Sequence, residues 1–196
     1  MKLSQNIILA MSQLERRAAL KSALKSACRK LLRRDLVMLA VGAHEQAICH
    51  RLAVYLEPFS DLNVDCEYNR QRIHPKSAPG LGHIKPDILI HKRMDPGFNL
   101  LVVEAKARVS TSTRDIRKVR ALTEVAGAFG YALGAYLHVQ NRPERVLRTG
   151  KVELSVKWEG ENEDSFHLEQ QVSAELLAEI RGQWKESYVK GGAAQF

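Results

Sequence analysis

The segment 85–108, KPDILIHKRMDPGFNLLVVEAKAR, constrains the fold more than any other part of the chain. Two apolar runs rich in Ile, Leu and Val flank the tripeptide Asp95-Pro96-Gly97. Asp, Pro and Gly each favour turns, so the segment predicts an antiparallel hairpin. Apolar runs of this length are typical of strands buried within a sheet. We therefore expect a fold built around a sheet that contains these two strands.

A turn centred between residues 95 and 96 places Asp87 opposite Glu104, and Lys85 opposite Lys106. Because side chains alternate between the two faces of a strand, Asp87, Glu104 and Lys106 share one face. The other face must be core, and it carries Ile88, Ile90, Leu101, Val103 and Ala105. The two carboxylates would then lie about 5 Å apart at Cβ. Like charges so close together are destabilising unless one is protonated or both find a counter-charge.

A hard divalent cation would remove this conflict, because Mg²⁺ binds one or two protein carboxylates together with water and phosphate oxygens. Lys106 cannot ligate a metal while it is charged, but it can orient an attacking water or hold a phosphate. Such a set suits metal-assisted hydrolysis of a phosphodiester. Cross-strand ion pairs in an ordinary sheet, Asp87 with Lys106 or Glu104 with Lys85, are the alternative interpretation.

Glu45 is a further acidic candidate, in the segment 40–57, whose spacing predicts a helix. It stands three residues before Ile48 and seven before Leu52, and so falls on the apolar face of that helix. A lone buried carboxylate is costly. We expect Glu45 to supply a third carboxylate if its helix packs on the face that carries Asp87.

The remaining periodicities complete an α/β pattern. They predict further helices over residues 12–36, 113–129 and 173–188. They predict strands over residues 64–68, 86–92, 99–107, 131–139 and 151–159, with a loop over 71–84. This order favours a mixed central sheet flanked by helices. We expect one domain over residues 1–196, divided into a basic N-terminal helix (1–39), a core (40–140) and a C-terminal strand and helix (141–196).

Three short motifs follow one another along the chain: Glu45, Pro86-Asp87 and, directly after LLVV, Glu104-Ala105-Lys106. This set resembles the PD-(D/E)XK nuclease superfamily. The phrases CEYNR, KPDILIHKR and LLVVEAKA also look like small bacterial proteins of that superfamily. The resemblance covers residues 40–140 and implies a restriction-endonuclease-like core, in which a helix is followed by three strands, a helix and a strand.

The resemblance implies a nuclease that uses Mg²⁺ or Mn²⁺. Its metal ligands would come from Asp87, Glu104, the backbone carbonyl of Ala105 and, as an additional acid, Glu45. Lys106 would position or activate the attacking water. Asp115 and Lys118 lie where such families often carry further polar residues, although an exposed charge pair three residues apart on a helix explains them equally well.

The net charge of +8 favours polyanions as partners. Candidate contacts to nucleic acid are Lys85, Lys118, Arg70, Lys21, Lys25 and Arg29. The last three belong to a basic stripe in the helix 12–36, which is either a solvated face or an edge that contacts phosphates. DNA is favoured over RNA because the superfamily mostly acts on DNA. The sequence leaves open whether the chain forms a homodimer or binds a partner protein.

Two functions without catalysis are kept as alternatives. One is a nucleic-acid-binding or assembly module that keeps the nuclease fold. The other is a structural partner protein that contacts a larger complex through the helix 12–36. The chain has no apolar run long enough for a membrane span. The widely spaced Cys28, Cys49 and Cys66 give neither a disulfide framework nor a zinc pattern, which favours the cytoplasm.

Overall fold

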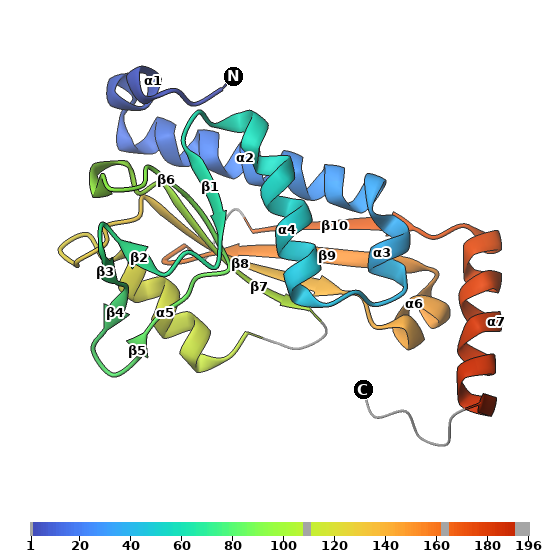
Figure 1. Cartoon of the computed structure of the whole chain (residues 1–196). Coiled ribbons are helices and arrows are strands. Elements are labelled where there is room, and N and C mark those ends of the chain that lie inside the picture. The colour runs from blue at the N-terminus through green and yellow to red at the C-terminus, as the bar shows by residue number, and fades with distance from the viewer. Residues whose placement is uncertain (1, 108–110, 162–164, 191–196) are drawn as a thin grey trace.

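A mixed six-stranded sheet organises the computed structural model, which describes residues 2–107, 111–161 and 165–190, with side chains up to residue 184 (Figure 1). The strands lie in the order β1-β6-β7-β8-β9-β10. Their bounds are β1 Asn63–Cys66, β6 Ile88–His91, β7 Leu101–Ala107, β8 Leu133–Gln140, β9 Lys151–Trp158 and β10 Phe166–Gln171. β7 and β8 are parallel, and the other neighbouring pairs of this sheet are antiparallel. The expected α/β fold with a mixed sheet is therefore confirmed.

Helices lie on both faces of the sheet (Figure 1). Their bounds are α1 Gln5–Ala10, α2 Gln13–Arg34, α3 Leu36–Ala40, α4 Glu45–Leu56, α5 Thr113–Thr123, α6 Pro143–Thr149 and α7 Ala174–Lys190. α2 and α4 pack against each other on one face. α5 packs on the other face, against β7 and β8. Among the described residues, no helix combines the length and apolar character needed to cross a membrane.

Each face of the sheet carries its own core. The core beneath α2 and α4 includes all five residues that the sequence predicts for it: Ile88, Ile90, Leu101, Val103 and Ala105. On the opposite face, Leu89 and Val102 pack against Val119 and Leu122 of α5. The face that carries the predicted acidic pair is thus apolar in its middle. It turns polar from Glu104, the middle residue of β7, onward.

The N-terminal region contains the short helices α1 and α3 in addition to α2, which corresponds to the predicted helix. α2 begins with a capping box, in which the Ser12 hydroxyl accepts a hydrogen bond from the Glu15 amide at 3.3 Å. It ends at Asp35, whose carboxylate accepts a hydrogen bond from Arg51 at 2.9 Å. α4 begins at Glu45 rather than at residue 40, because the chain turns at Gly42, which has a φ of 79°.

The helix predicted over residues 113–129 ends earlier, at Thr123. The chain turns back at this point, and the Leu122 carbonyl accepts a hydrogen bond from the Tyr131 amide at 2.9 Å. Val125, which the helical pattern would bury, is 88% exposed. Phe129 still reaches the core beneath α5, but from a loop.

Residues 71–84 form two short hairpins instead of a plain loop. They are β2 Arg70–Gln71 with β3 His74–Pro75, and β4 Ser77–Ala78 with β5 Gly82–His83. The buried Lys76 holds this region together, because its ammonium group donates to the backbone carbonyls of Tyr68, at 3.4 Å, and Arg70.

The C-terminal region holds two elements that the sequence analysis does not predict. One is α6, which starts at Pro143 and ends at Gly150 in the left-handed conformation, with a φ of 70°. The other is β10, which pairs with β9 along its whole length. The described residues from 141 to 190 therefore form two helices and two strands rather than one of each.

Candidate metal centre at the ends of β6 and β7

The hairpin register predicted from the turn is confirmed. Ile88 pairs with Val103, and Leu89 and Ile90 continue the same register along β7. Asp87 immediately precedes β6, and the same register places it opposite Glu104 of β7. Its Oδ2 accepts a hydrogen bond from the backbone amide of Ala105 at 2.7 Å. The C=O and N–H of one strand residue point to the same side, so the Ala105 carbonyl also faces the side of Asp87.

Glu104 is the buried centre of the cluster, with 1% of its side chain exposed. Its Oε1 forms an ion pair with the Lys118 ammonium and lies 3.7 Å from the Lys106 ammonium. Its Oε2 is buried, with no hydrogen-bond partner among the described residues. Burial, and then the negative charge of Asp87, raises the pKa of Glu104 to about 8. Burial also raises the pKa of Asp87. Both carboxyl groups therefore resist ionisation although the Lys118 and Lys106 ammonium groups lie near Glu104.

Lys106 lies between acidic side chains that come from different elements. Its Nζ is 3.2 Å from Glu45 Oε1 and 3.9 Å from Asp115 Oδ1. Burial alone would lower the pKa of Lys106, but the surrounding carboxylates, Glu45 foremost, outweigh it and raise the pKa above its usual value. Lys106 therefore stays protonated and carries a positive charge next to Glu104.

Glu45 joins this cluster, although its helix does not pack on the sheet face that carries the acidic pair. Ile48 and Leu52 of α4 face the core on the opposite side of the sheet from α5. Glu45 is the first residue of α4, and its side chain is 34% exposed. Its Oε2 accepts a hydrogen bond from the Ala107 amide at 3.3 Å, beyond Lys106 on β7. Glu45 thus reaches the site from the end of the helix.

Asp115 and Lys118 are part of the cluster, and the exposed charge pair considered for them is wrong. Asp115 is buried at the start of α5, where its Oδ2 accepts hydrogen bonds from the amide, at 2.9 Å, and the hydroxyl, at 2.7 Å, of Ser112. Burial would raise the pKa of Asp115, but these hydrogen bonds prevail and lower it. Lys118 has 13% of its side chain exposed and contacts Glu104. Four acids and two lysines therefore meet here.

The side chains of the other predicted contacts to nucleic acid are exposed or contact groups outside this cluster. Lys85 is exposed and paired with Glu67 at 2.8 Å, and Arg70 is exposed on β2. Lys21 and Lys25 of the basic stripe lie over the rings of Trp158 and Phe166, each at 5.6 Å. Arg29 is exposed on the same helix. Much of the stripe therefore packs on the β9–β10 side of the sheet and is not a free cationic face.

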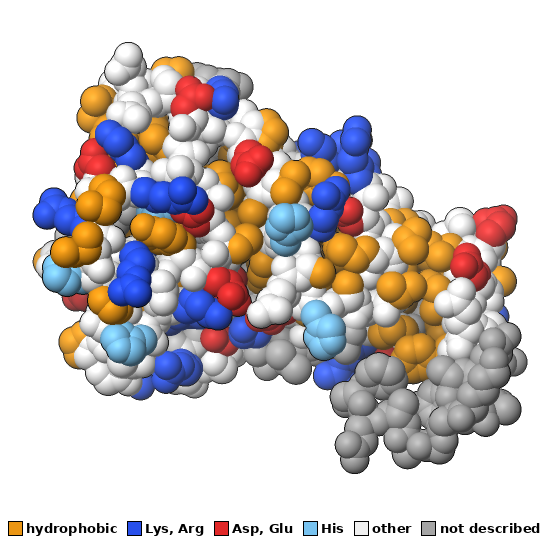
Figure 2. Space-filling view, in the orientation of Figure 1, with side chains coloured by type: hydrophobic (Ala, Val, Ile, Leu, Met, Phe, Trp, Pro, Cys, Tyr) orange, Lys and Arg blue, Asp and Glu red, His pale blue; other side chains and the backbone are white. Residues whose placement is uncertain are grey.

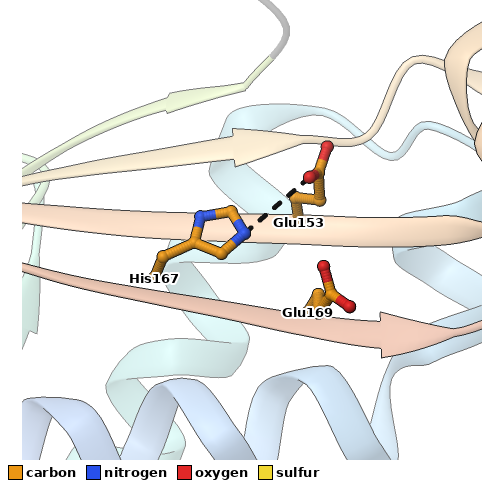
Figure 3. A group of neighbouring side chains, drawn as sticks. All are labelled: Glu153, His167 and Glu169. Atoms are coloured by element: carbon orange, nitrogen blue, oxygen red, sulfur yellow. Dashed lines mark ion pairs between the residues drawn. The ribbon is translucent and has the colours of Figure 1, made fainter.

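A second group of possible metal ligands lies on β9 and β10, and the sequence analysis does not predict it. Ligand atoms of Glu153, His167 and Glu169 lie within 4.8 Å of one another (Figure 3). Arg145, at 2.6 Å, and Lys151, at 3.2 Å, already form ion pairs with Glu153. Arg145 in particular lowers the pKa of Glu153. These charges are compensated, unlike the buried Oε2 of Glu104.

The donors at the ends of β6 and β7 fit a hard cation. Asp87 and Glu104 supply carboxylate oxygens, and Ala105 supplies a carbonyl that faces the same side; oxygen donors of these kinds bind Mg²⁺. Burial raises the pKa of the Cys49 thiol on α4, which makes it a poor nucleophile. Comparisons with protein-family models, with curated proteins and with solved structures find no match to this chain.

The raised pKa of Glu104 predicts how stability depends on pH in the metal-free protein. Between the ordinary value of 4.5 and about 8, Glu104 is protonated in the folded chain and ionised in the unfolded chain. The unfolded state then binds fewer protons, so the free energy of unfolding should fall as pH rises through this window. Urea denaturation at a series of pH values measures this. In Glu104→Gln the free energy of unfolding should lose this dependence on pH. If it falls with pH as steeply in the variant as in the wild type, Glu104 is not the group responsible.

Proposed function

We propose that this chain is a metal-dependent nuclease with a restriction-endonuclease-like fold, which hydrolyses phosphodiester bonds in nucleic acid, DNA in preference to RNA. One observation carries the proposal. Asp87 and Glu104 lie together just past the paired stretch of β6 and β7. A buried Glu104 oxygen has no partner among the described residues, next to the charged Lys106. A buried carboxylate oxygen without a partner is available to a cation.

The residues divide into three roles. Asp87, Glu104 and the Ala105 carbonyl would hold Mg²⁺ or Mn²⁺. The bound metal would polarise the phosphate and make a water molecule more acidic. Lys106 would hold that water or a phosphate oxygen through its ammonium group. Glu45 and Asp115 keep this ammonium charged and fix its direction from two sides.

The charge near the site supports an anionic substrate. Figure 2 shows Lys and Arg side chains spread over the part of the molecule that carries the two short hairpins, with a few acidic side chains among them. Exposed cations in and just after these hairpins include Arg70, Arg72 and Lys85, of which Lys85 pairs with Glu67. A cationic surface next to a site for a divalent cation suits a substrate with many phosphates.

The proposal is tested by titrating Mg²⁺ and Mn²⁺ into the protein by calorimetry, and then assaying the same samples for nuclease activity. Asp87→Asn and Glu104→Gln should each weaken cation binding by more than tenfold, because each removes one ligand charge. Glu153→Gln is the matched control. It removes one charge from the cluster on β9 and β10 and should leave both readouts unchanged.

A nucleic-acid-binding module with little catalysis is the second candidate, and the Lys118–Glu104 ion pair favours it. Two lysines already offset half of the acidic charge in the cluster, so the chain can fold without a cation. Wild-type protein that binds an oligonucleotide but neither cation, with or without that oligonucleotide, would favour this module. It would contradict the nuclease.

A further inference from the structure

Lys118 contacts one oxygen of the Glu104 carboxylate, next to the oxygen that is free to bind a metal. Its Nζ contacts Glu104 Oε1 and also donates to the backbone carbonyl of Lys85 at 3.2 Å. Only 13% of the Lys118 side chain is exposed, so water weakens this ion pair little. The ammonium is therefore held between Glu104 and the segment that leads into Asp87.

The charges of the cluster leave room for one divalent cation. Glu45, Asp87, Glu104 and Asp115 carry four negative charges when ionised, and Lys106 and Lys118 carry two positive ones. The remaining excess equals the charge of one divalent cation. A cation bound by Asp87 and Glu104 would lie next to the Lys118 ammonium, and like charges repel strongly in such a buried place. The metal and the present position of Lys118 are thus in competition.

We propose that Lys118 is an exchangeable cation, which contacts Glu104 in the metal-free protein and leaves that side chain when a divalent cation binds and Glu104 gives up its proton. This rests on the proposed metal site at Asp87 and Glu104. The Lys85 carbonyl gives the displaced ammonium a nearby acceptor, so the exchange needs a movement of one side chain rather than of α5. Lys118 is in this sense a positioning residue that sets the affinity for metal and keeps the metal-free site folded.

The test compares Mg²⁺ affinity in wild type and in Lys118→Met by calorimetry. The variant should bind Mg²⁺ about tenfold more tightly, because one competing positive charge is gone. The melting temperature of the metal-free variant should be lower than that of the metal-free wild type. Adding Mg²⁺ should raise the melting temperature of the variant by more than it raises that of the wild type. Arg117→Met is the matched control, since it removes one charge from the next residue of α5. Arg117 is exposed and bonds to Gly80, so the affinity should stay within about twofold.

Lys118→Gln is the second variant to use if Lys118→Met does not fold. Its amide can still donate a hydrogen bond to Glu104 but carries no charge. In metal-free protein, combining either substitution with Glu104→Gln should cost less stability than the two single effects together. Mg²⁺ binding by the wild type with equal or weaker binding by both Lys118 variants would overturn the exchange alone. If none of these proteins binds Mg²⁺ or Mn²⁺, the exchange and the nuclease proposal both fail.

Discussion

Replacing Lys106 by methionine should lower the rate of phosphodiester hydrolysis by about 10²–10⁴-fold. The Lys106 ammonium is held by Glu45 at 3.2 Å and lies 3.7 Å from Glu104, so it is positioned before any substrate arrives. Methionine keeps the length of the side chain but removes the group that would hold the water or phosphate. The measurement is kcat under saturating Mg²⁺.

The same variant separates catalysis from metal binding. Asp87 and Glu104 remain in Lys106→Met, so calorimetry should show Mg²⁺ binding no weaker than in the wild type. Lys151→Met provides a control, since Lys151 pairs with Glu153 and Glu169 on β9 and β10. If Lys106→Met hydrolyses the substrate at the wild-type rate, Lys106 has no catalytic role and only forms ion pairs.

Gly134→Ala should reduce the free energy of unfolding by about 1–3 kcal/mol through overpacking. Gly134 lies on β8 beneath α5, and a Cβ there would meet Val119 Cγ1 at 2.5 Å, Thr123 Cγ2 at 2.9 Å and Glu159 Cβ at 3.1 Å. All three neighbours must move, and two of them belong to α5. Because α5 carries Lys118, which competes with the metal for Glu104, moving this helix away from β8 should also tighten metal binding. Chemical denaturation and calorimetry measure the two effects.

Gly182→Ala in α7 is the matched control for this substitution. A Cβ at Gly182 meets nothing within 4 Å, and alanine is the better helix former by about 1 kcal/mol. Gly182→Ala should therefore leave stability unchanged or raise it, with no effect on the metal site. If both substitutions change stability alike, the close approach of β8 and α5 does not limit the fold.

The hairpin was predictable because its signals are local. The residues Asp95-Pro96-Gly97 fix the turn, and the turn fixes which residues of β6 and β7 pair. From that register, the placement of Glu104 beside Asp87 follows with no knowledge of the rest of the chain. The same reasoning identified the core face, since alternation along a strand needs only its register.

The remaining parts of the site depend on contacts far apart in the sequence. The exposed i,i+3 alternative for Asp115 and Lys118 failed because β7 places Glu104 beside α5, which no helical pattern reveals. The position of Glu45 depended on where α4 begins, and Gly42 shortened that helix by a turn. Similarly, Lys21 and Lys25 look like a free cationic face in the sequence, yet aromatic rings of β9 and β10 lie beneath them.

The convergence of α4 and α5 on the end of β7 has a consequence for the order of folding. Glu45 arrives from a helix on one face of the sheet and Lys118 from a helix on the other. Residues so distant in sequence meet only after both layers have docked, and such non-local assembly is slow. We expect a chain still emerging during synthesis to lack this charged cluster until α5 has joined β7 and β8. The partly folded molecule would then hold neither the cation nor a substrate.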